Sequence, residues 1–189
     1  MLEENQIYII VDIELNGLIP GRHSILSIGA VASTTEKEVG SFYKKLQPLD
    51  ELTEDPETMA WWNTQVEAFK EVTADNEPAS AVMEAFRDWV KSFGKSPIFV
   101  ASPLILDYPF IKWYLHRFDI EPLFEDFKPI QRTLDLASFT AGKLNIPLAR
   151  SRRMQLPPAM TKDMPEHSHK AIDDARGYGV ILRNTLLAG

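Results

Sequence analysis

The chain has 189 residues, of which 44% are hydrophobic, and this is enough to bury a core of ordinary size. It contains no cysteine, which excludes a disulfide framework and a thiolate zinc site, and no apolar run reaches the roughly 18 residues that a membrane span needs. Its net charge of −7 is unfavourable for a protein that binds polyanions over its whole surface. A chain of this length is expected to form one domain over residues 1–189. Nothing at the N-terminus resembles a secretion signal, so we expect a cytoplasmic location and no membrane partner.

Hydrophobic periodicity and turn residues predict an α/β chain with a mixed central β-sheet flanked by α-helices. Strands are expected near residues 6–12, 24–34, 38–47 and 97–101. Helices are expected near residues 56–69, 78–93, 107–118, 133–143 and 169–187. The polar turn from Ser33 to Glu38 predicts that the second and third strands form an antiparallel hairpin.

Two acidic residues follow the first apolar run, which extends from Ile7 to Val11. Asp12 and Glu14 are two residues apart, so in a strand they project to the same face. Paired carboxylates repel near a core unless a cation neutralises them, and oxygen ligands suit Mg²⁺ or Mn²⁺. The alternative is that the strand has reached its solvent-exposed end, where acidic residues are ordinary.

Two adjacent aromatic residues, Trp61 and Trp62, lie in the helix expected near 56–69. Neighbouring helical residues differ by about 100° in direction, so one ring can enter the core while the other faces a cleft. An exposed ring can stack on a nucleobase. The alternative is that both rings serve only packing, which is the usual role of large aromatic side chains.

Asp107 follows the fourth apolar run and opens the helix expected near 107–118. A carboxylate in the first helical turn complements the helix dipole, so a structural role is an adequate explanation for this residue alone.

Positive charge is concentrated toward the C-terminus. Residues 1–142 carry 12 basic and 23 acidic side chains, whereas residues 143–189 carry 8 and 4, so the net charge changes from −11 to +4. Arg150, Arg152 and Arg153 lie in the Pro-rich segment from Asn145 to Ser168 and could contact phosphates. A solvated loop that keeps the chain soluble is the alternative.

His169 and Asp174 lie at the start of the last expected helix, five residues apart. Five residues advance a helix by about 500°, or about 140° net, so the two side chains do not share one helical stripe. We therefore expect His169 in an irregular first turn or a loop. A histidine at a helix start can also be a simple surface or cap residue.

The order of these motifs resembles the DEDDh 3′-5′ exonuclease family, which includes RNase T, oligoribonuclease and the proofreading exonuclease of bacterial replicative polymerases. The matching elements are Asp-x-Glu at the end of the first strand, an Asp after a mid-chain strand, and His-x-Ala-x-x-Asp-Ala near the C-terminus. The resemblance extends from Ile7 to about Leu187 and includes an Ile-Gly-Ala-Val signature in the second strand. It implies an RNase H-like fold.

The resemblance also implies roles for individual residues. Asp12, Glu14, Asp107 and Asp174 match the ligands of two divalent ions, Mg²⁺ or Mn²⁺, and His169 matches the general base. Two such ions, roughly 3.5–4 Å apart, promote phosphodiester hydrolysis. The catalytic set is therefore His169 with the four carboxylates. The candidate substrate-binding residues are Leu15, Asn16, Gly17, Leu18, Trp61, Trp62, Arg150, Arg152 and Arg153.

Two positions depart from the family pattern. Asn16 stands where many members have Thr, and the Asn often placed before the second-motif Asp is absent, with Ser102 and Pro103 nearby instead. Neither change removes a metal ligand, and both concern how the terminal nucleotide is held.

The expected function is removal of nucleotides from single-stranded 3′ ends. RNA is favoured over DNA as the partner, because the Trp-Trp-x-x-Gln pattern resembles a subgroup of DEDDh exoribonucleases. The alternatives are a DNA exonuclease of the proofreading or repair type and a catalytically silent nucleic-acid-binding protein. A homodimer is also plausible from the resemblance.

Overall fold

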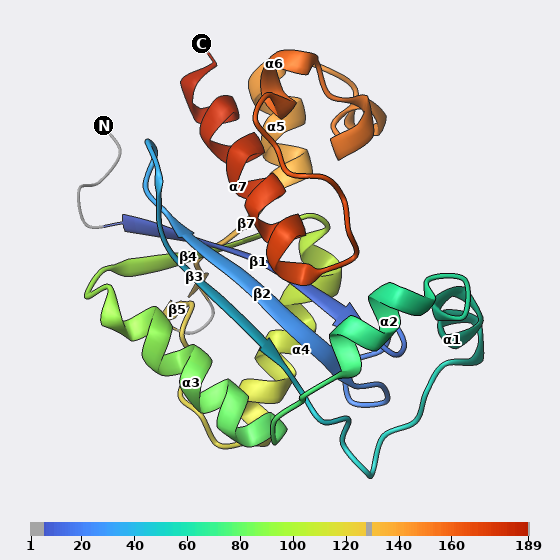
Figure 1. The fold of residues 1–189 in the computed structure, drawn as a ribbon. Helices are drawn as coiled ribbons and strands as arrows, with labels where there is room; N and C mark the ends of the chain where they lie inside the picture. Colours follow the sequence, from blue (N-terminus) through green and yellow to red (C-terminus); the bar gives the residue numbers. More distant parts are fainter. Residues whose placement is uncertain (1–5, 128–129, 189) are drawn as a thin grey trace.

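The computed structural model describes residues 6–127 and 130–188. Its central feature is a five-stranded sheet with strand order β3-β2-β1-β4-β7 (Figure 1). These strands are β1 (Gln6–Leu15), β2 (Ile25–Ser33), β3 (Glu38–Lys45), β4 (Ser96–Ala101) and β7 (Thr133–Asp135). The first three pair antiparallel, and β4 and β7 continue the sheet in parallel with β1. The predicted mixed sheet and its β2–β3 hairpin are confirmed.

Helices cover both faces of this sheet. The helices are α1 (Pro56–Trp62), α2 (Val66–Thr73), α3 (Ala79–Ser92), α4 (Leu104–Arg117), α5 (Leu136–Leu144), α6 (Pro158–Thr161) and α7 (Ala171–Leu187). In Figure 1, α7, α5 and α6 lie on one face, α3 and α4 on the other, and α1 and α2 lie beyond the arrowhead of β1. A short pair of strands, β5 (Glu125–Phe127) and β6 (Ile130–Gln131), forms a separate two-stranded sheet.

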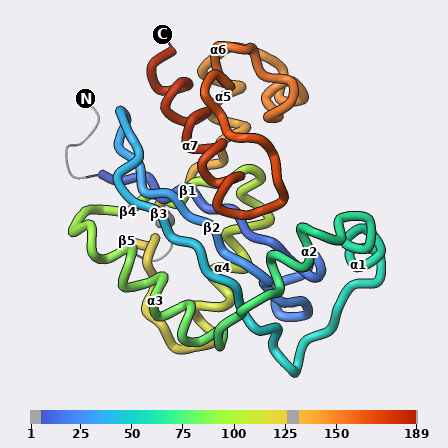
Figure 2. Tube along the Cα trace, in the orientation of Figure 1, coloured from blue at the N-terminus to red at the C-terminus, as the bar shows by residue number. Residues whose placement is uncertain are grey.

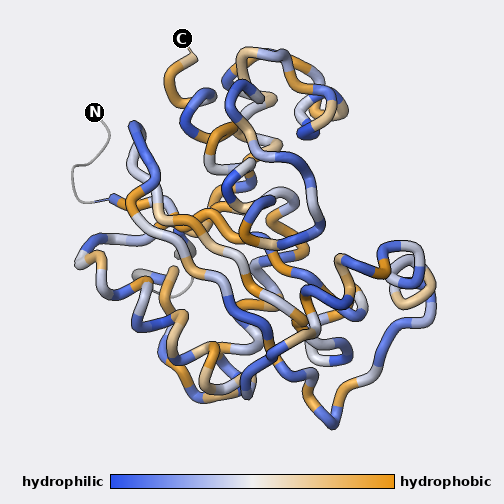
Figure 3. The backbone as a smooth tube through the Cα atoms, viewed as in Figure 1, coloured by the Kyte–Doolittle hydropathy of each residue, from blue (hydrophilic) through white to orange (hydrophobic). Residues whose placement is uncertain are grey.

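The alternation of side chains along β1 assigns each residue to one of two cores. Ile9 and Ile13 pack with α3 and α4, whereas Tyr8 and Ile10 pack with α5, α6 and α7. Asp12 and Glu14 continue the second series, so both point to the face that α7 covers. Figure 3 shows the hydrophobic residues along the central strands and a hydrophilic turn between β2 and β3.

The helix predicted over residues 56–69 is wrong as a continuous element. The structure has two helices there, and Figure 2 shows the chain changing direction between α1 and α2. Thr64 donates its hydroxyl to the carbonyl of Trp61 at 2.7 Å, and Gln65 has a non-helical backbone with φ −119° and ψ 47°. Short polar side chains that bond to nearby backbone compete with helix continuation.

Three other predicted boundaries differ. The helix predicted from 133 begins at Leu136, because residues 133–135 pair with β4 and Asp135 then caps the helix by accepting from the amide of Ser138 at 2.7 Å. Helix α4 begins at Leu104, three residues before Asp107. The segment predicted as irregular between 145 and 168 contains two 3-10 turns, Leu148–Arg150 and Arg153–Gln155, besides α6.

No helix within residues 6–127 and 130–188 is long and apolar enough to cross a membrane.

Gly29 sets the distance between α7 and the sheet. It lies in β2 directly opposite Asp12, on the face that α7 covers. A Cβ atom added at Gly29 would overlap the backbone of Ala171 and Ile172, the first residues of α7. The absence of a side chain at this position therefore lets the helix begin in direct contact with the strand.

We expect Gly29→Ala to destabilise the protein by about 1–3 kcal/mol, because the added methyl group must push the start of α7 away from the sheet. Urea unfolding would measure the change. Gly142→Ala is the matched control, since Gly142 lies in α5 and an added Cβ would meet no atom within 4 Å beyond its chain neighbours and the nearby backbone of its own helix. That control should be neutral or stabilising by up to about 1 kcal/mol. Equal stability of Gly29→Ala and the parent would contradict the packing argument.

Candidate active site

Three carboxylates from the two ends of the chain meet on one face of the sheet. Asp12 and Glu14 project from β1, and Asp174 projects from the first turn of α7. One oxygen of each lies within 4.8 Å of one oxygen of the others. The alternation of β1 brings the first two together, and the contact of α7 with Gly29 brings the third.

The fourth predicted carboxylate, Asp107, lies beside this cluster. It is 3% exposed in the first turn of α4, and the backbone of Ile13 donates a hydrogen bond to it. Pro103 is the N-cap residue of this helix and makes no side-chain cap. Asp107 is therefore not the N-cap residue, although its carboxylate also accepts a hydrogen bond from its own amide in the first turn.

Burial raises the pKa values of Asp12, Glu14 and Asp107, and for the first two repulsion from neighbouring carboxylates adds to this effect. Burial, followed by repulsion from Asp107, Glu14 and Asp174, raises the pKa of Asp12 well above its usual range. Burial and the charges of Asp174, Asp107 and Glu71 raise the pKa of Glu14 to about 8. Burial alone raises the pKa of Asp107 to about 8, against the effect of its backbone hydrogen bonds. A cluster that resists ionisation in this way is suited to a divalent cation, and its all-oxygen donor set fits Mg²⁺ or Mn²⁺.

His169 lies in the loop before α7, as expected from its spacing to Asp174. Its φ of +54° is left-handed, so it cannot belong to the helix. Its ring centre lies 5.1 Å from that of Trp61 and 4.3 Å from that of His167. Burial and the neighbouring His167 lower the pKa of His169 from its usual value, although Asp174 opposes this. A neutral imidazole at the edge of the carboxylate cluster can accept a proton near pH 7.

Two basic side chains bind the same oxygen of Asp174. Nη1 of Arg153 and Nδ1 of His167 each lie 2.6 Å from Oδ1 of this carboxylate. The Arg153 side chain is 8% exposed, so it lies inside the protein, whereas the other two candidate arginines, Arg150 and Arg152, are exposed on the loop.

A groove of about 340 Å³ opens beside Glu14. Its residues are Ile13, Glu14, Leu15, Leu18, Asp55, Glu57, Thr58, Trp61, Trp62 and Leu106. Trp61 is 40% exposed along it, whereas Trp62 is 1% exposed and donates its indole N–H to the carbonyl of Leu15 at 2.8 Å. One ring therefore serves the core and the other faces the groove.

Asn16 and Gly17, two further candidate substrate-binding residues, shape the end of β1. Asn16 is buried, and its Oδ1 accepts a hydrogen bond from the amide of Ser24 at 2.6 Å. Gly17 lies so close to the His23 ring that a Cβ atom would overlap it. Both residues fix the turn that leads to Leu18, which is 60% exposed.

A network of polar and charged side chains near Glu14 was not predicted from the sequence. The hydroxyl of Tyr43 donates to Glu71 at 2.6 Å, and the ammonium groups of Lys45 and Lys170 lie 3.4 and 3.6 Å from the same carboxylate. Glu71 comes from α2, far from every motif, so only its contacts identify it. Leu106, which lines the groove, was also not predicted, although its position immediately before the candidate ligand Asp107 indicates that it lies close to the site.

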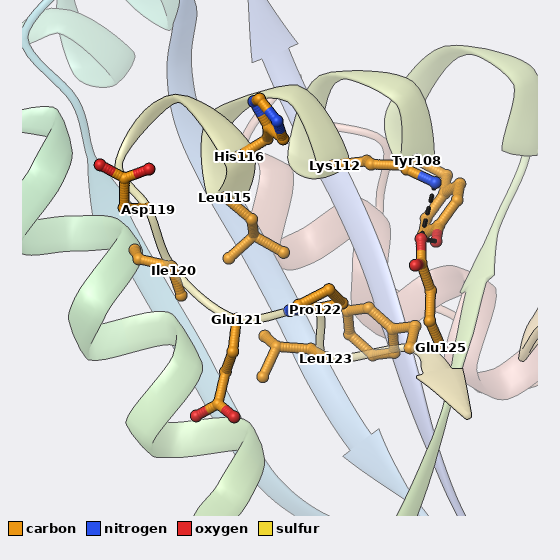
Figure 4. A pocket seen from close by; sticks show the side chains of 11 residues that line it. Tyr108, Lys112, Leu115, His116, Asp119, Ile120, Glu121, Pro122, Leu123 and Glu125 are labelled. Carbon is orange, nitrogen blue, oxygen red and sulfur yellow. Dashed lines mark hydrogen bonds and ion pairs between the residues drawn. The ribbon is translucent and has the colours of Figure 1, made fainter. Parts of the chain in front are cut away.

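A larger cavity, of about 520 Å³, lies between α4 and the loop that follows it (Figure 4). The apolar side chains of Leu115, Ile120 and Leu123 lie along it, and Lys112 pairs with Glu125 at its edge at 2.6 Å. None of its lining residues is a candidate site residue.

A model of the 3′-5′ exoribonuclease Rv2179c-like domain matches residues 7–186. The chain belongs to this family. A curated relative, the 3′-5′ DNA exonuclease Cap18 of Escherichia coli, is 31% identical over 119 residues, which cover 61% of this chain and 60% of Cap18. The chain thus matches less than two thirds of the length of that relative.

Solved structures of DEDDh exonucleases share the fold of this Rv2179c-like domain. The nuclease domain of 3′hExo bound to rAMP aligns with a TM-score of 0.72 and 12% identity, over 99% of this chain and 94% of that one. The zinc-bound complex of Escherichia coli ExoI with single-stranded DNA aligns with a TM-score of 0.69 and 14% identity, over 93% and 39% of the two chains. The resemblance to DEDDh exonucleases and the RNase H-like fold are confirmed.

We expect Asp12→Asn to leave the metal-free protein at least as stable as the parent, because a neutral amide relieves the repulsion within the cluster. Added Mn²⁺ should raise the melting temperature of the parent, since a ligand that binds only the folded state stabilises it. The variant should lose most of this increase. Differential scanning fluorimetry measures both effects. Asp88→Asn, an exposed acid on α3, is the control and should keep the parent's response. An undiminished Mn²⁺ response in Asp12→Asn would contradict the assignment.

Proposed function

We propose that this protein is a metal-dependent 3′-to-5′ exonuclease that hydrolyses phosphodiester bonds at single-stranded 3′ ends, with RNA favoured over DNA. The observation that carries the proposal is the meeting of three carboxylates within 4.8 Å, beside Asp107 and His169, at the mouth of a groove lined by Trp61. The match of the Rv2179c-like exoribonuclease model over residues 7–186 supports both the activity and the preference for RNA.

Asp12, Glu14, Asp107 and Asp174 would hold two divalent ions, Mg²⁺ or Mn²⁺. When bound, such ions polarise the phosphodiester and lower the pKa of a water molecule. The protein supplies these carboxylates, and the raised pKa values of Asp12, Glu14 and Asp107 make a neutralising cation favourable beside them. It also buries Asp107 and Asp174, which keeps their positions fixed.

His169 would take the proton from the attacking water. Its imidazole is held by contacts with the rings of Trp61 and His167, and its lowered pKa keeps it in the basic form at neutral pH. Its place on the loop next to α7 puts it five residues before a candidate metal ligand.

The groove beside Glu14 would hold the terminal nucleoside. Leu15 and Leu18 supply apolar surface and Trp61 an exposed ring for stacking, while Trp62, Asn16 and Gly17 shape the groove from within. The exposed Arg150 and Arg152 would meet phosphates further along the strand. Arg153 has a different environment, because its guanidinium is buried against Asp174.

DNA is the second candidate substrate. It is favoured by a specific observation, the 31% identity to Cap18, which is a DNA exonuclease. A catalytically silent binding protein and a homodimer stay predictions from the sequence.

The proposal predicts stepwise, metal-dependent loss of nucleotides from the 3′ end of single strands. Matched RNA and DNA oligonucleotides labelled at the 5′ end, incubated with Mg²⁺, Mn²⁺ or EDTA, would give ladders at single-nucleotide resolution. We expect faster shortening of RNA and none in EDTA. Faster shortening of DNA would reverse the substrate preference. No shortening of either strand, with binding retained, would identify a silent binding protein.

Asp174→Ala and the control Asp88→Ala make this test specific to the site. Asp174→Ala should abolish cleavage while circular dichroism stays that of the parent, and Asp88→Ala should cleave normally. Parent-like cleavage by Asp174→Ala would show that another site is responsible.

The acid limb of the pH profile should report His169. Because its pKa lies below the usual 6.5, the imidazole is neutral at pH 7 and turnover should fall only as pH drops below about 6.5. His169→Ala should lower turnover by about 10²–10⁴-fold. Turnover should be measured at a metal concentration that saturates at each pH.

His167→Ala is the matched variant. Removing the His167 ring should raise the pKa of His169 and move the acid limb to higher pH. An unchanged acid limb in His169→Ala would disprove its role as the base.

A further inference from the structure

Arg153 is buried and paired with a carboxylate, whereas an arginine that binds phosphate must be accessible to the nucleic acid. Its side chain is 8% exposed, Nη1 lies 2.6 Å from Oδ1 of Asp174, and Nη2 donates to the carbonyl of Pro165 at 2.7 Å. Its guanidinium carbon also lies 5.9 Å from the ring centre of Tyr178. Both terminal nitrogens are therefore engaged inside the protein.

Helix α7 leaves room for this guanidinium. Gly177 lies within the helix, where glycine costs roughly 0.5–1 kcal/mol relative to alanine. A Cβ atom at Gly177 would lie 2.9 Å from Nη1 of Arg153 and 3.0 Å from Cζ. The guanidinium thus occupies space that a side chain at position 177 would take, and this observation is independent of its hydrogen bonds.

Arg153 contacts only one of the two carboxylate oxygens of Asp174. Oδ1 receives both Arg153 and His167. Among the residues that the structure describes, no hydrogen bond reaches Oδ2. One oxygen is therefore held by the protein, and the other is left for a ligand.

The second contact of Arg153 acts on the loop that carries the base. Pro165 lies four residues before His169, so the bond to its carbonyl ties this loop to the same guanidinium that holds Asp174. A lysine could not make both contacts from one planar fork, because its ammonium is a single point charge.

We propose that Arg153 is a positioning residue, which orients Asp174 toward the metal ions and holds the loop of His169 over the carboxylates. This inference rests on the proposed exonuclease function and replaces the phosphate contact expected for Arg153 from the sequence. Groups that orient metal ligands typically change metal affinity or activity by about 10–100-fold when they are replaced.

Arg153→Lys is the main test, because it keeps the charge and removes the fork. We expect kcat to fall by about 10–100-fold with KM within about twofold of the parent. Arg152→Gln, at the exposed neighbouring arginine, should show the opposite pattern, a raised KM with kcat retained. A raised KM and a parent-like kcat in Arg153→Lys would overturn the proposal and return Arg153 to phosphate binding.

Gly177→Ala tests the same geometry without changing any charged group. The added methyl group presses on the guanidinium, so kcat should fall, while the preference of alanine for the helix, roughly 0.5–1 kcal/mol, offsets part of the loss of stability. This variant serves even where Arg153→Lys fails to fold. Parent-like kcat in Gly177→Ala would contradict the proposal.

Mn²⁺ binding measured by electron paramagnetic resonance, without nucleic acid, separates the two proposals. If the parent binds Mn²⁺ but cleaves neither RNA nor DNA, the proposed function fails. The positioning role is then decided by the metal alone: Arg153→Lys should weaken Mn²⁺ binding by about tenfold or more, and unchanged binding would refute it.

Discussion

The contact between the start of α7 and Gly29 of β2 is the constraint on which the site depends. Asp12 lies opposite Gly29 in the paired strand, and Asp174 lies in the first turn of the helix that rests on it. Any side chain at position 29 would overlap the helix backbone and move Asp174 away from the strand. One missing side chain in the sheet thus brings together acids that are 162 residues apart in the sequence.

This arrangement works against the stability of the metal-free protein. Buried carboxylates that repel one another raise their own pKa values, and Asp12 and Glu14 both do so. Arg153 offsets part of this repulsion, since it lowers the pKa of Asp12 and pairs with Asp174. The Arg153 guanidinium therefore offsets only part of the repulsion, and a bound divalent ion would relieve the repulsion that is left.

The two tryptophans of α1 lie in different environments, one buried and one exposed. Trp62 closes the core by bonding to the backbone of Leu15, which fixes α1 against the end of β1. Trp61 is thereby held at the groove, with its ring against that of His169. Trp61 therefore contacts both the groove and His169, so the proposed nucleoside site and the proposed base are linked through one side chain.

The sequence alone determined four of the five strands of the sheet, the hairpin, the family resemblance and the choice of Asp12, Glu14, Asp107, Asp174 and His169 as candidates. These features depend on local periodicity and on motif spacing, which the chain carries directly. It did not determine the break between α1 and α2, where Thr64 bonds to the backbone, or the strand at 133–135, which exists only through pairing with β4. Only the tertiary structure placed Arg153 on Asp174 instead of in solvent, because burial and partners depend on how distant segments pack.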